Sequence, residues 1–219
     1  MSVGYGFNNI PGLVSAFDVG NPKSYSGSGS TWYDLLNPSQ TGPGDPYWAN
    51  NIDSITISLV IQKIANVVGY AEHPVAKWNS AYNNNSSFIL YHFGTTSGSD
   101  NQMHWYGNID QNLNSGWAQI AQVGTMTNGS YNHVVLQHNS VNGAQGWLNG
   151  TKSGSRGAAG MLGQTILASN ASTAAASINT GPSASSYSRV HHIQFYNREL
   201  TDQEILGLYS ALKLRFSTP

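Results

Sequence analysis

The C-terminal stretch at residues 189–216, RVHHIQFYNRELTDQEILGLYSALKLRF, decides the fold. Residues 189–197 mix aromatic and β-branched side chains with polar ones, which is typical of a strand. Thr201 and Glu204 then match a capping box, in which a hydroxyl and a carboxylate accept hydrogen bonds from free N–H groups at the start of a helix. The stretch therefore predicts a last strand over 189–197 and a helix over 201–214. The helix would pack on a sheet through one apolar face, formed by Ile205, Leu208, Tyr209, Leu212 and Phe216.

The rest of the chain has the patterns of further strands. The clearest is residues 54–61, where every second residue is Ile or Leu. Asn149-Gly150 suits both positive-φ positions of a type I′ turn and predicts a hairpin within 146–152. We also expect strands at 12–18, 75–78, 87–93, 103–106, 117–123, 131–138 and 166–168, and a loop at 171–186. These patterns predict an all-β sandwich with one short C-terminal helix, and the even composition favours one domain over residues 1–219.

Charged residues are scarce along the whole chain. They make up 9% of the 219 residues, against about 25% in an average soluble domain, and the net charge is −1. Binding to nucleic-acid phosphates or to an anionic membrane surface requires a surplus of Lys and Arg, so both functions are excluded. The hydrophobic content of 39% argues against intrinsic disorder.

The absence of cysteine excludes disulfides, thiolate nucleophiles and cysteine-based zinc sites. The first residues do not combine a basic region with an apolar run, so no signal peptide is predicted. No segment approaches the roughly 18 consecutive apolar residues of a membrane span, and no membrane insertion is expected.

Several segments carry a family resemblance, and they follow one another in the family's order. They are GLVSAFDVGNPKSY (12–25) with WYDL (32–35), YNHVV (131–135), GWLNG (146–150) and VHHIQFYNRELTDQEI (190–205). Together they resemble laminin-G-like, concanavalin A-like lectin domains found in bacteriophage and marine virus structural proteins. The resemblance implies a two-sheet antiparallel jelly-roll sandwich of about a dozen strands. Residues 37–45 depart from the family's glycine- and asparagine-rich run, which puts the role of that loop in doubt.

The same resemblance implies a place on the surface of a virion, as a capsid decoration protein or a tail or fibre component. Such a chain would be made in the host cytoplasm and would join an oligomer or larger assembly. Its partners would be other virion proteins, namely capsid, tail or fibre subunits, together with cell-surface glycans.

Sugar hydrolysis on this fold needs two carboxylates on one strand face, about 5–5.5 Å apart in a retaining enzyme. The laminarinase-like relatives carry Glu-x-Asp-x-x-Glu on one strand, and this sequence has no such run. Asp202 and Glu204 are close in sequence but belong to the helix cap. We therefore assign no catalytic residue and expect no enzyme.

The histidine spacing gives no metal site. His191 and His192 are adjacent on a predicted strand and are expected to point to opposite faces, as are His133 and His138. The other candidates, His73, His92 and His104, have no acidic residue at a useful spacing for a metal site.

Calcium binds to hard oxygen ligands, and the sequence contains candidates for such ligands. Asp100 and Asp110 are the candidate ligands, with Asp18 and Asn21 as a second group. The carboxylates are too sparse for a tight cage, so no cofactor is assigned.

One neutral, aromatic-rich segment is the candidate glycan-binding site. Aromatic faces can stack on sugar rings, and neutral amides can bind hydroxyls. The candidate residues are Asn101, Gln102, His104, Trp105, Tyr106 and Asn108. The alternative is that the aromatics fill the sandwich interior, as Trp105 would beside Met103.

These observations favour a non-enzymatic virion structural module with lectin-like binding of host glycans. A stand-alone carbohydrate-binding lectin is the alternative. A glycoside hydrolase is the third hypothesis, and the missing carboxylate pair argues against it.

Overall fold

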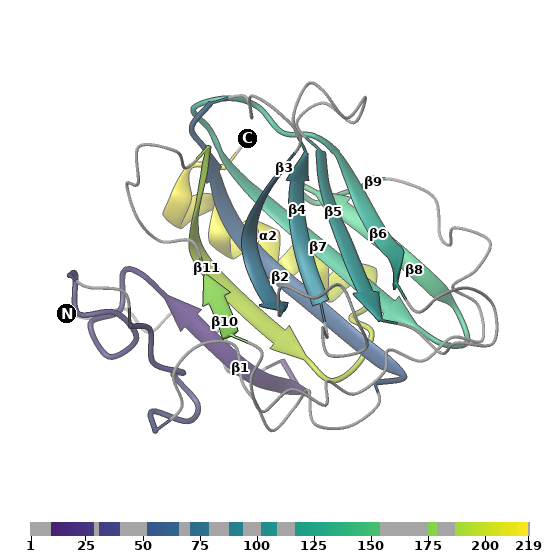
Figure 1. The fold of residues 1–219 in the computed structure, drawn as a ribbon, viewed down its shortest axis with the longest axis horizontal. Coiled ribbons are helices and arrows are strands. Elements are labelled where there is room, and N and C mark those ends of the chain that lie inside the picture. Colours follow the sequence, from purple (N-terminus) through teal and green to yellow (C-terminus); the bar gives the residue numbers. More distant parts are fainter. Residues whose placement is uncertain are drawn as a thin grey trace.

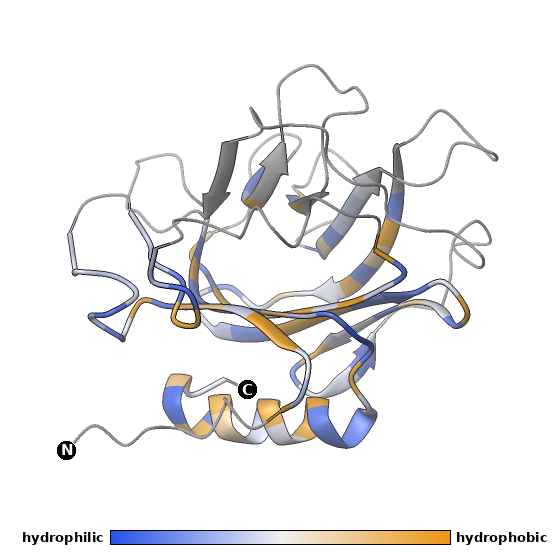
Figure 2. Ribbon diagram, turned by 90° about the horizontal axis from the view of Figure 1, so that it is seen from below, coloured by the Kyte–Doolittle hydropathy of each residue, from blue (hydrophilic) through white to orange (hydrophobic). Residues whose placement is uncertain are grey.

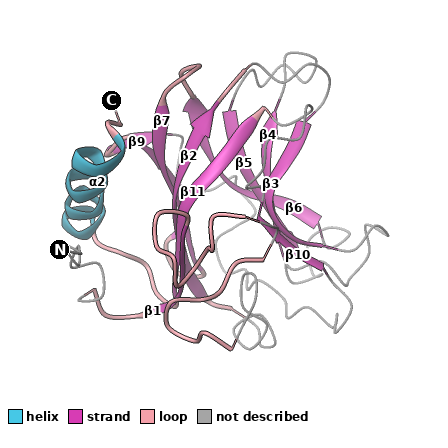
Figure 3. Cartoon of the chain, turned by 90° about the vertical axis from the view of Figure 1, so that its left-hand side faces the viewer, coloured by secondary structure: helices cyan, strands magenta, loops and turns pink. Residues whose placement is uncertain are grey.

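The computed structural model describes residues 10–28, 31–39, 52–65, 71–78, 88–93, 102–108, 117–153, 175–178 and 187–218. Within these ranges the chain forms two stacked β-sheets with a helix against the outer face of one of them (Figure 1, Figure 3). Figure 2 shows the layers from the side, with the helix below the larger sheet and the smaller sheet above it. None of the described helices is long and apolar enough to cross a membrane.

Both sheets are antiparallel throughout. The six-stranded sheet has the order β1 (Leu13–Asp18), β11 (Ser188–Tyr196), β2 (Ser54–Lys63), β7 (Tyr131–Asn139), β8 (Gly143–Leu148), β9 (Thr151–Ser153). The five-stranded sheet has the order β10 (Ala175–Ile178), β3 (Ala71–Trp78), β4 (Phe88–Phe93), β5 (Gln102–Asn108), β6 (Trp117–Thr125). The predicted all-β sandwich with a C-terminal helix is confirmed.

The core between the sheets is built on the alternation predicted for β2. Its residues Ile55, Ile57, Leu59 and Ile61 are fully buried and face the five-stranded sheet. Burying such a side chain contributes roughly 1.5–3 kcal/mol each. The five-stranded sheet contributes side chains to the same cluster, among them Val75, Leu90, Met103 and Trp105.

Helix α2 (Asp202–Phe216) covers the other face of the six-stranded sheet. The Thr201 hydroxyl accepts from the Glu204 N–H, and the Glu204 carboxylate accepts from the Thr201 N–H, which confirms the predicted capping box. Ile205, Leu208 and Leu212 are buried. They belong to a second apolar cluster with residues of the sheet, Val60, Val135, Trp147 and Tyr196.

The hairpin between β8 and β9 has the predicted type I′ geometry. Asn149 and Gly150 both have positive φ, 51° and 77°. A Cβ at position 150 would lie 2.6 Å from the Tyr209 ring of α2, so close packing as well as φ requires glycine there. The Asn149 side chain accepts from the His133 N–H at 2.8 Å, which fixes the turn against β7.

The prediction of a loop over residues 171–186 is wrong for part of that range. Ala175–Ile178 forms β10, which pairs with β3 in the register Ala175 to Trp78. Its residues are nearly all small, so they carry no hydrophobic alternation that could have marked a strand. The strand predicted at 166–168 lies outside the described residues.

The prediction that His191 and His192 point to opposite faces is also wrong. The register of β11 against β2 shifts just before His192, and such a bulge lets neighbouring residues face the same side. The His191 ring lies 6.3 Å from that of Phe216 in α2. His192 Nδ1 is 3.3 Å from Asp18, whose carboxylate also binds Arg215 of α2. Both histidines therefore face the helix layer.

His133 and His138 do lie on opposite faces of β7, as predicted. The His133 ring faces Tyr209 of α2. His138 pairs in register with Ile55 and Ala144, which both belong to the core between the sheets.

Leu208→Ala should lower the free energy of unfolding by about 2–5 kcal/mol, because it removes buried volume between α2 and the sheet. Leu214→Ala is the matched control, since Leu214 is 85% exposed. We expect its effect to stay within about 0.5 kcal/mol in the same urea titration. Equal losses for the two variants would contradict the packing described.

Thr201→Ala should cost about 1 kcal/mol through loss of the helix cap. Thr201→Ser keeps the hydroxyl and should retain most of that stability. Thermal unfolding of the two variants beside the original chain measures the difference, and an unchanged midpoint for Thr201→Ala would rule out a stabilising cap.

Candidate functional site

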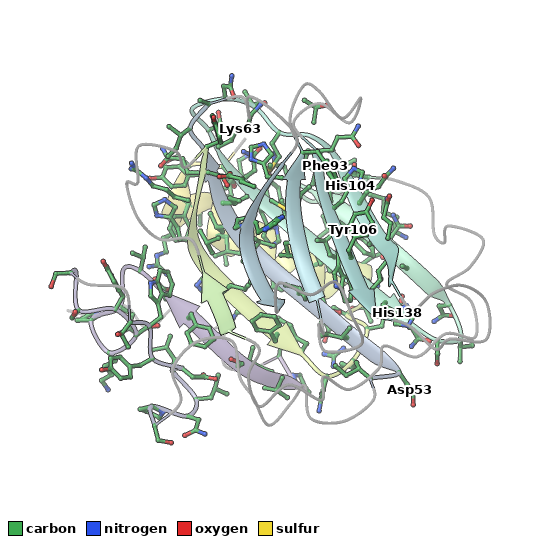
Figure 4. All side chains as sticks on the ribbon, viewed as in Figure 1. Asp53, Lys63, Phe93, His104, Tyr106 and His138 are labelled. Atoms are coloured by element: carbon green, nitrogen blue, oxygen red, sulfur yellow. The ribbon has the colours of Figure 1, made fainter. Side chains whose placement is uncertain are left out.

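The outer face of the five-stranded sheet brings several predicted site residues together. Along β5, Met103 and Trp105 are fully buried in the core between the sheets. Because side chains alternate along a strand, Gln102, His104 and Tyr106 face away from the six-stranded sheet. Figure 4 shows His104 and Tyr106 on this outer face.

Three rings form a group on this face. Phe93 of β4 contacts the edge of His104, with ring centroids 4.6 Å apart, and lies 6.2 Å from Tyr106. The His104 and Tyr106 rings are nearly parallel, at 11°, with centroids 6.3 Å apart. The neighbouring strands thus bring three rings together, of which Phe93 and Tyr106 are partly exposed and His104 is buried between them (Figure 4).

Glutamine side chains border the rings. The Tyr106 hydroxyl donates to Gln119 Oε1 at 3.4 Å, and Gln119 Nε2 donates to Gln122 Oε1 at 2.7 Å. On the other side of the group, His104 Nε2 lies 3.0 Å from Gln102 Oε1. We call Phe93, Gln102, His104, Tyr106, Gln119 and Gln122 the outer patch.

A β-bulge allows Gln119 and Gln122 to share the outer face. Residues three apart on a regular strand point to opposite sides. Here the register shifts between Trp105, which pairs with Ala121, and Tyr106, which pairs with Gln119. The intervening Ile120 is buried in the core.

The outer patch is electrically neutral near pH 7. Burial lowers the pKa of His104, an effect that a hydrogen bond with Gln119 partly opposes, so the imidazole is uncharged. Burial raises the pKa of Tyr106, which keeps its hydroxyl protonated. The strands β4, β5 and β6 contain no Asp, Glu, Lys or Arg. The outer patch would therefore contact a ligand through rings and uncharged hydrogen-bonding groups.

The structure separates the predicted glycan-binding residues. Gln102, His104 and Tyr106 lie together on the outer face. Trp105 is completely buried beside Met103 and presents no face to solvent, so for this residue the alternative of a core position is correct. Asn108 ends β5, opposite Trp117. Asn101 lies outside the described residues.

Sequence reasoning missed Phe93, Gln119 and Gln122. Phe93 is distant in the sequence and joins the patch only because β4 pairs with β5. The two glutamines belong to a predicted strand, and on a regular strand they would lie on different faces. A bulge has no signal in this sequence that could have corrected the assignment.

His92 does have an acidic partner, contrary to the expectation from sequence distance. Its Nδ1 lies 3.0 Å from Glu72 Oε1, across the pairing of β3 with β4. Glu72 also accepts from the Tyr187 N–H at 2.9 Å and from the Ser188 hydroxyl. The carboxylate therefore links the two sheets at one end of the core, and it does not reach the outer patch.

In the part of the chain that the structure describes, no three His, Asp or Glu side chains gather in a way that could hold a metal ion. The calcium candidates Asp100 and Asp110 lie outside that part. In the second group, Asp18 binds Arg215 through both carboxylate oxygens and also contacts His192. Arginine thus occupies the carboxylate that calcium would need.

No protein-family model matches the sequence, and no curated protein matches it. The structure is similar to solved β-sandwich domains. The receptor-binding domain of botulinum neurotoxin D has a TM-score of 0.52 at 12% identity, over 80% of this chain and 41% of that one. The binding domain of botulinum neurotoxin serotype G has a TM-score of 0.50 at 11% identity, over 79% and 40%. Trypanosoma rangeli sialidase has a TM-score of 0.48 at 14% identity, over 95% of this chain and 34% of that one.

This chain thus corresponds to about two fifths of the length of the two neurotoxin domains. At such low identity the likeness concerns the fold alone. It supports the assignment of the chain to β-sandwich folds.

Proposed function

We propose that this chain is a non-enzymatic, lectin-like module of a virion, and that its outer patch binds an uncharged saccharide. The observation that carries the proposal is the grouping of three rings and three glutamines on one face of the five-stranded sheet. Aromatic rings pack against the apolar face of a sugar, while amides and a phenol exchange hydrogen bonds with its hydroxyls.

The neutrality of the outer patch defines the class of ligand. Without a cationic side chain on β4, β5 or β6, the patch has no strong partner for the carboxylate of a sialic acid or for a sulfate. Hydrogen bonds and ring contacts are little affected by salt screening. We therefore expect weak binding of neutral sugars that changes little with ionic strength.

The absence of acids from these strands supports a binding role rather than hydrolysis. Cleavage of a glycosidic bond requires a general acid and a second carboxylate flanking the bond. Glu72 is the acid of the adjacent strand β3, and its contacts with His92 and Ser188 hold it at the junction of the sheets.

The place on a virion rests on the resemblance of residues 12–25, 32–35, 131–135, 146–150 and 190–205 to bacteriophage and marine virus domains. A receptor-binding domain of a neurotoxin has a similar fold, which supports a binding role for this chain too. A stand-alone lectin is the second candidate, since the outer patch would serve it equally well.

Tyr106→Ala should abolish detectable binding on an array of neutral glycans, because it removes one ring and the hydroxyl that meets Gln119. Tyr33→Ala is the matched control, since Tyr33 is 41% exposed and lies outside the sheets. We expect the control to bind like the original chain, at low and at high salt. Equal binding by both variants, or binding that disappears at high salt, would contradict the proposed site.

Two further measurements separate the hypotheses. A reducing-sugar assay should show no hydrolysis, with or without EDTA, and sugar release that one Asp or Glu substitution abolishes would indicate an enzyme. Mass spectrometry of purified virus particles should find this chain in a fixed copy number. Its absence from the particles, with glycan binding intact, would favour the stand-alone lectin.

A further inference from the structure

Three histidines lie between α2 and the sheet beneath it. They come from β7 and β11, the two strands that flank β2. Two of them contact rings of the helix directly, and the third contacts Asp18, which binds Arg215 of the helix. The contacts are His133 with Tyr209, His191 with Phe216 and, through Asp18, His192 with Arg215.

His133 is fully buried in a position that suits only the neutral ring. It lies nearly parallel to Tyr209, at 13° with centroids 6.1 Å apart, and its Nε2 is 3.0 Å from Ser58 Oγ. Its Nδ1 is buried without a hydrogen-bond partner. Lys213 adds a positive charge nearby, with its Nζ 5.5 Å from the centroid of the same Tyr209 ring. Burial, with a smaller effect of His192, lowers the pKa of His133 to about 3.

His191 packs among rings and cations. Its ring meets the edge of Tyr131, with centroids 5.0 Å apart, and is close to Phe216. Burial lowers its pKa, and Arg189 and Arg215 lower it further.

Asp18 is the acid that opposes these positive charges. It raises the pKa of His191, but both of its oxygens already bind Arg215. The acids of the first helical turn lie at the other end of α2, where Asp202 pairs with Lys152 and Glu204 with Arg198. Among the described residues around the three histidines, no further carboxylate is in place to balance a new positive charge.

Helix α2 and the core between the sheets are held by different sets of apolar residues. The apolar residues that hold α2 form one cluster, with Leu208 and Trp147 among them. The residues between the two sheets form another, with Ile57 and Trp105 among them. The helix therefore contributes no side chain to the core between the sheets.

We propose that α2 leaves the six-stranded sheet at acidic pH. Protonation of His133 and His191 detaches the helix, while the two-sheet sandwich stays folded. Release uncovers the apolar strip on that sheet that includes Val60, Val135 and Trp147.

The pH window follows from the direction of the shifts. Both histidines have a lower pKa under the helix than the value of 6.5 for an exposed histidine, so the released state binds protons more readily. The closed state has its full stability above pH 6.5 and loses it as the pH falls below that value. For each histidine, the equilibrium constant for closing falls by up to about tenfold per pH unit. Asp18 and Glu204 stay ionised at pH 5, because the pKa of each is lowered, that of Glu204 to about 2. The histidines therefore act before the ion pairs are lost.

Hydrogen–deuterium exchange at pH 7.5, 6.5, 5.5 and 4.5 tests the release. Protection factors remove the pH dependence of chemical exchange itself. We expect protection of the α2 amides to fall about tenfold or more between pH 6.5 and 5.5, while the β2 amides keep theirs. Unchanged protection of α2, or loss of protection in α2 and β2 together, would overturn the proposal.

The double variant His133→Gln/His191→Gln removes both titrating groups and should flatten the pH dependence of α2 exchange. His73→Gln is the matched control, because it removes a partly buried histidine of the other sheet whose pKa burial also lowers. It should behave like the original chain. A double variant with the original pH dependence would overturn the assignment to these histidines; if it does not fold, the comparison of α2 with β2 in the original chain still decides.

Discussion

The structure depends on the burial of β2 and β7 on both faces. Their inner side chains meet the five-stranded sheet and their outer side chains meet α2. Polar groups in such a layer must find partners within the protein. Thr56 donates to the Arg198 carbonyl at 2.8 Å, and Gln137 donates to Glu199 at 2.8 Å. The segment that connects β11 to α2 is thereby held down by the same strands that the helix covers.

The two sides of the sandwich consequently differ in chemistry. On the helix side, apolar contacts and ion pairs involve parts of the chain that are distant in sequence, such as Asp18 and Arg215. On the opposite side, Phe93, His104 and Tyr106 form a neutral surface edged by amides. The proposed ligand site and the proposed pH response therefore lie on opposite faces of the sandwich.

Much of the fold could be predicted because local patterns matched the final environment. The alternation of Ile55 to Ile61, the box of Thr201 and Glu204, and the Asn149-Gly150 turn each contain their own structural information. Residues Ala175–Ile178 contain no such local information, because this strand of mostly small residues is defined by its pairing with β3.

The candidate site was harder to predict, and the reason is backbone irregularity. A bulge in β11 breaks the alternation that was used for His191 and His192, and a bulge in the β5–β6 pair brings Gln119 and Gln122 to one face. Whether Trp105 or its neighbours faced solvent was also undetermined, because both sets of side chains on β5 contain aromatic rings. Only the position of the second sheet distinguishes them.

The position of β1 has a consequence for biosynthesis. Leu13 pairs with Tyr196, so the strand that is translated first among those described finds its partner only after the residues between them have been translated. Contacts between such distant residues form slowly. Until residues 188–216 leave the ribosome, β2 lacks its partner β11, and the face of β2 that carries Val60 is not covered by α2. A nascent chain that stalls before residue 188 would carry an open strand edge beside an apolar surface, the combination that promotes aggregation and recruits chaperones.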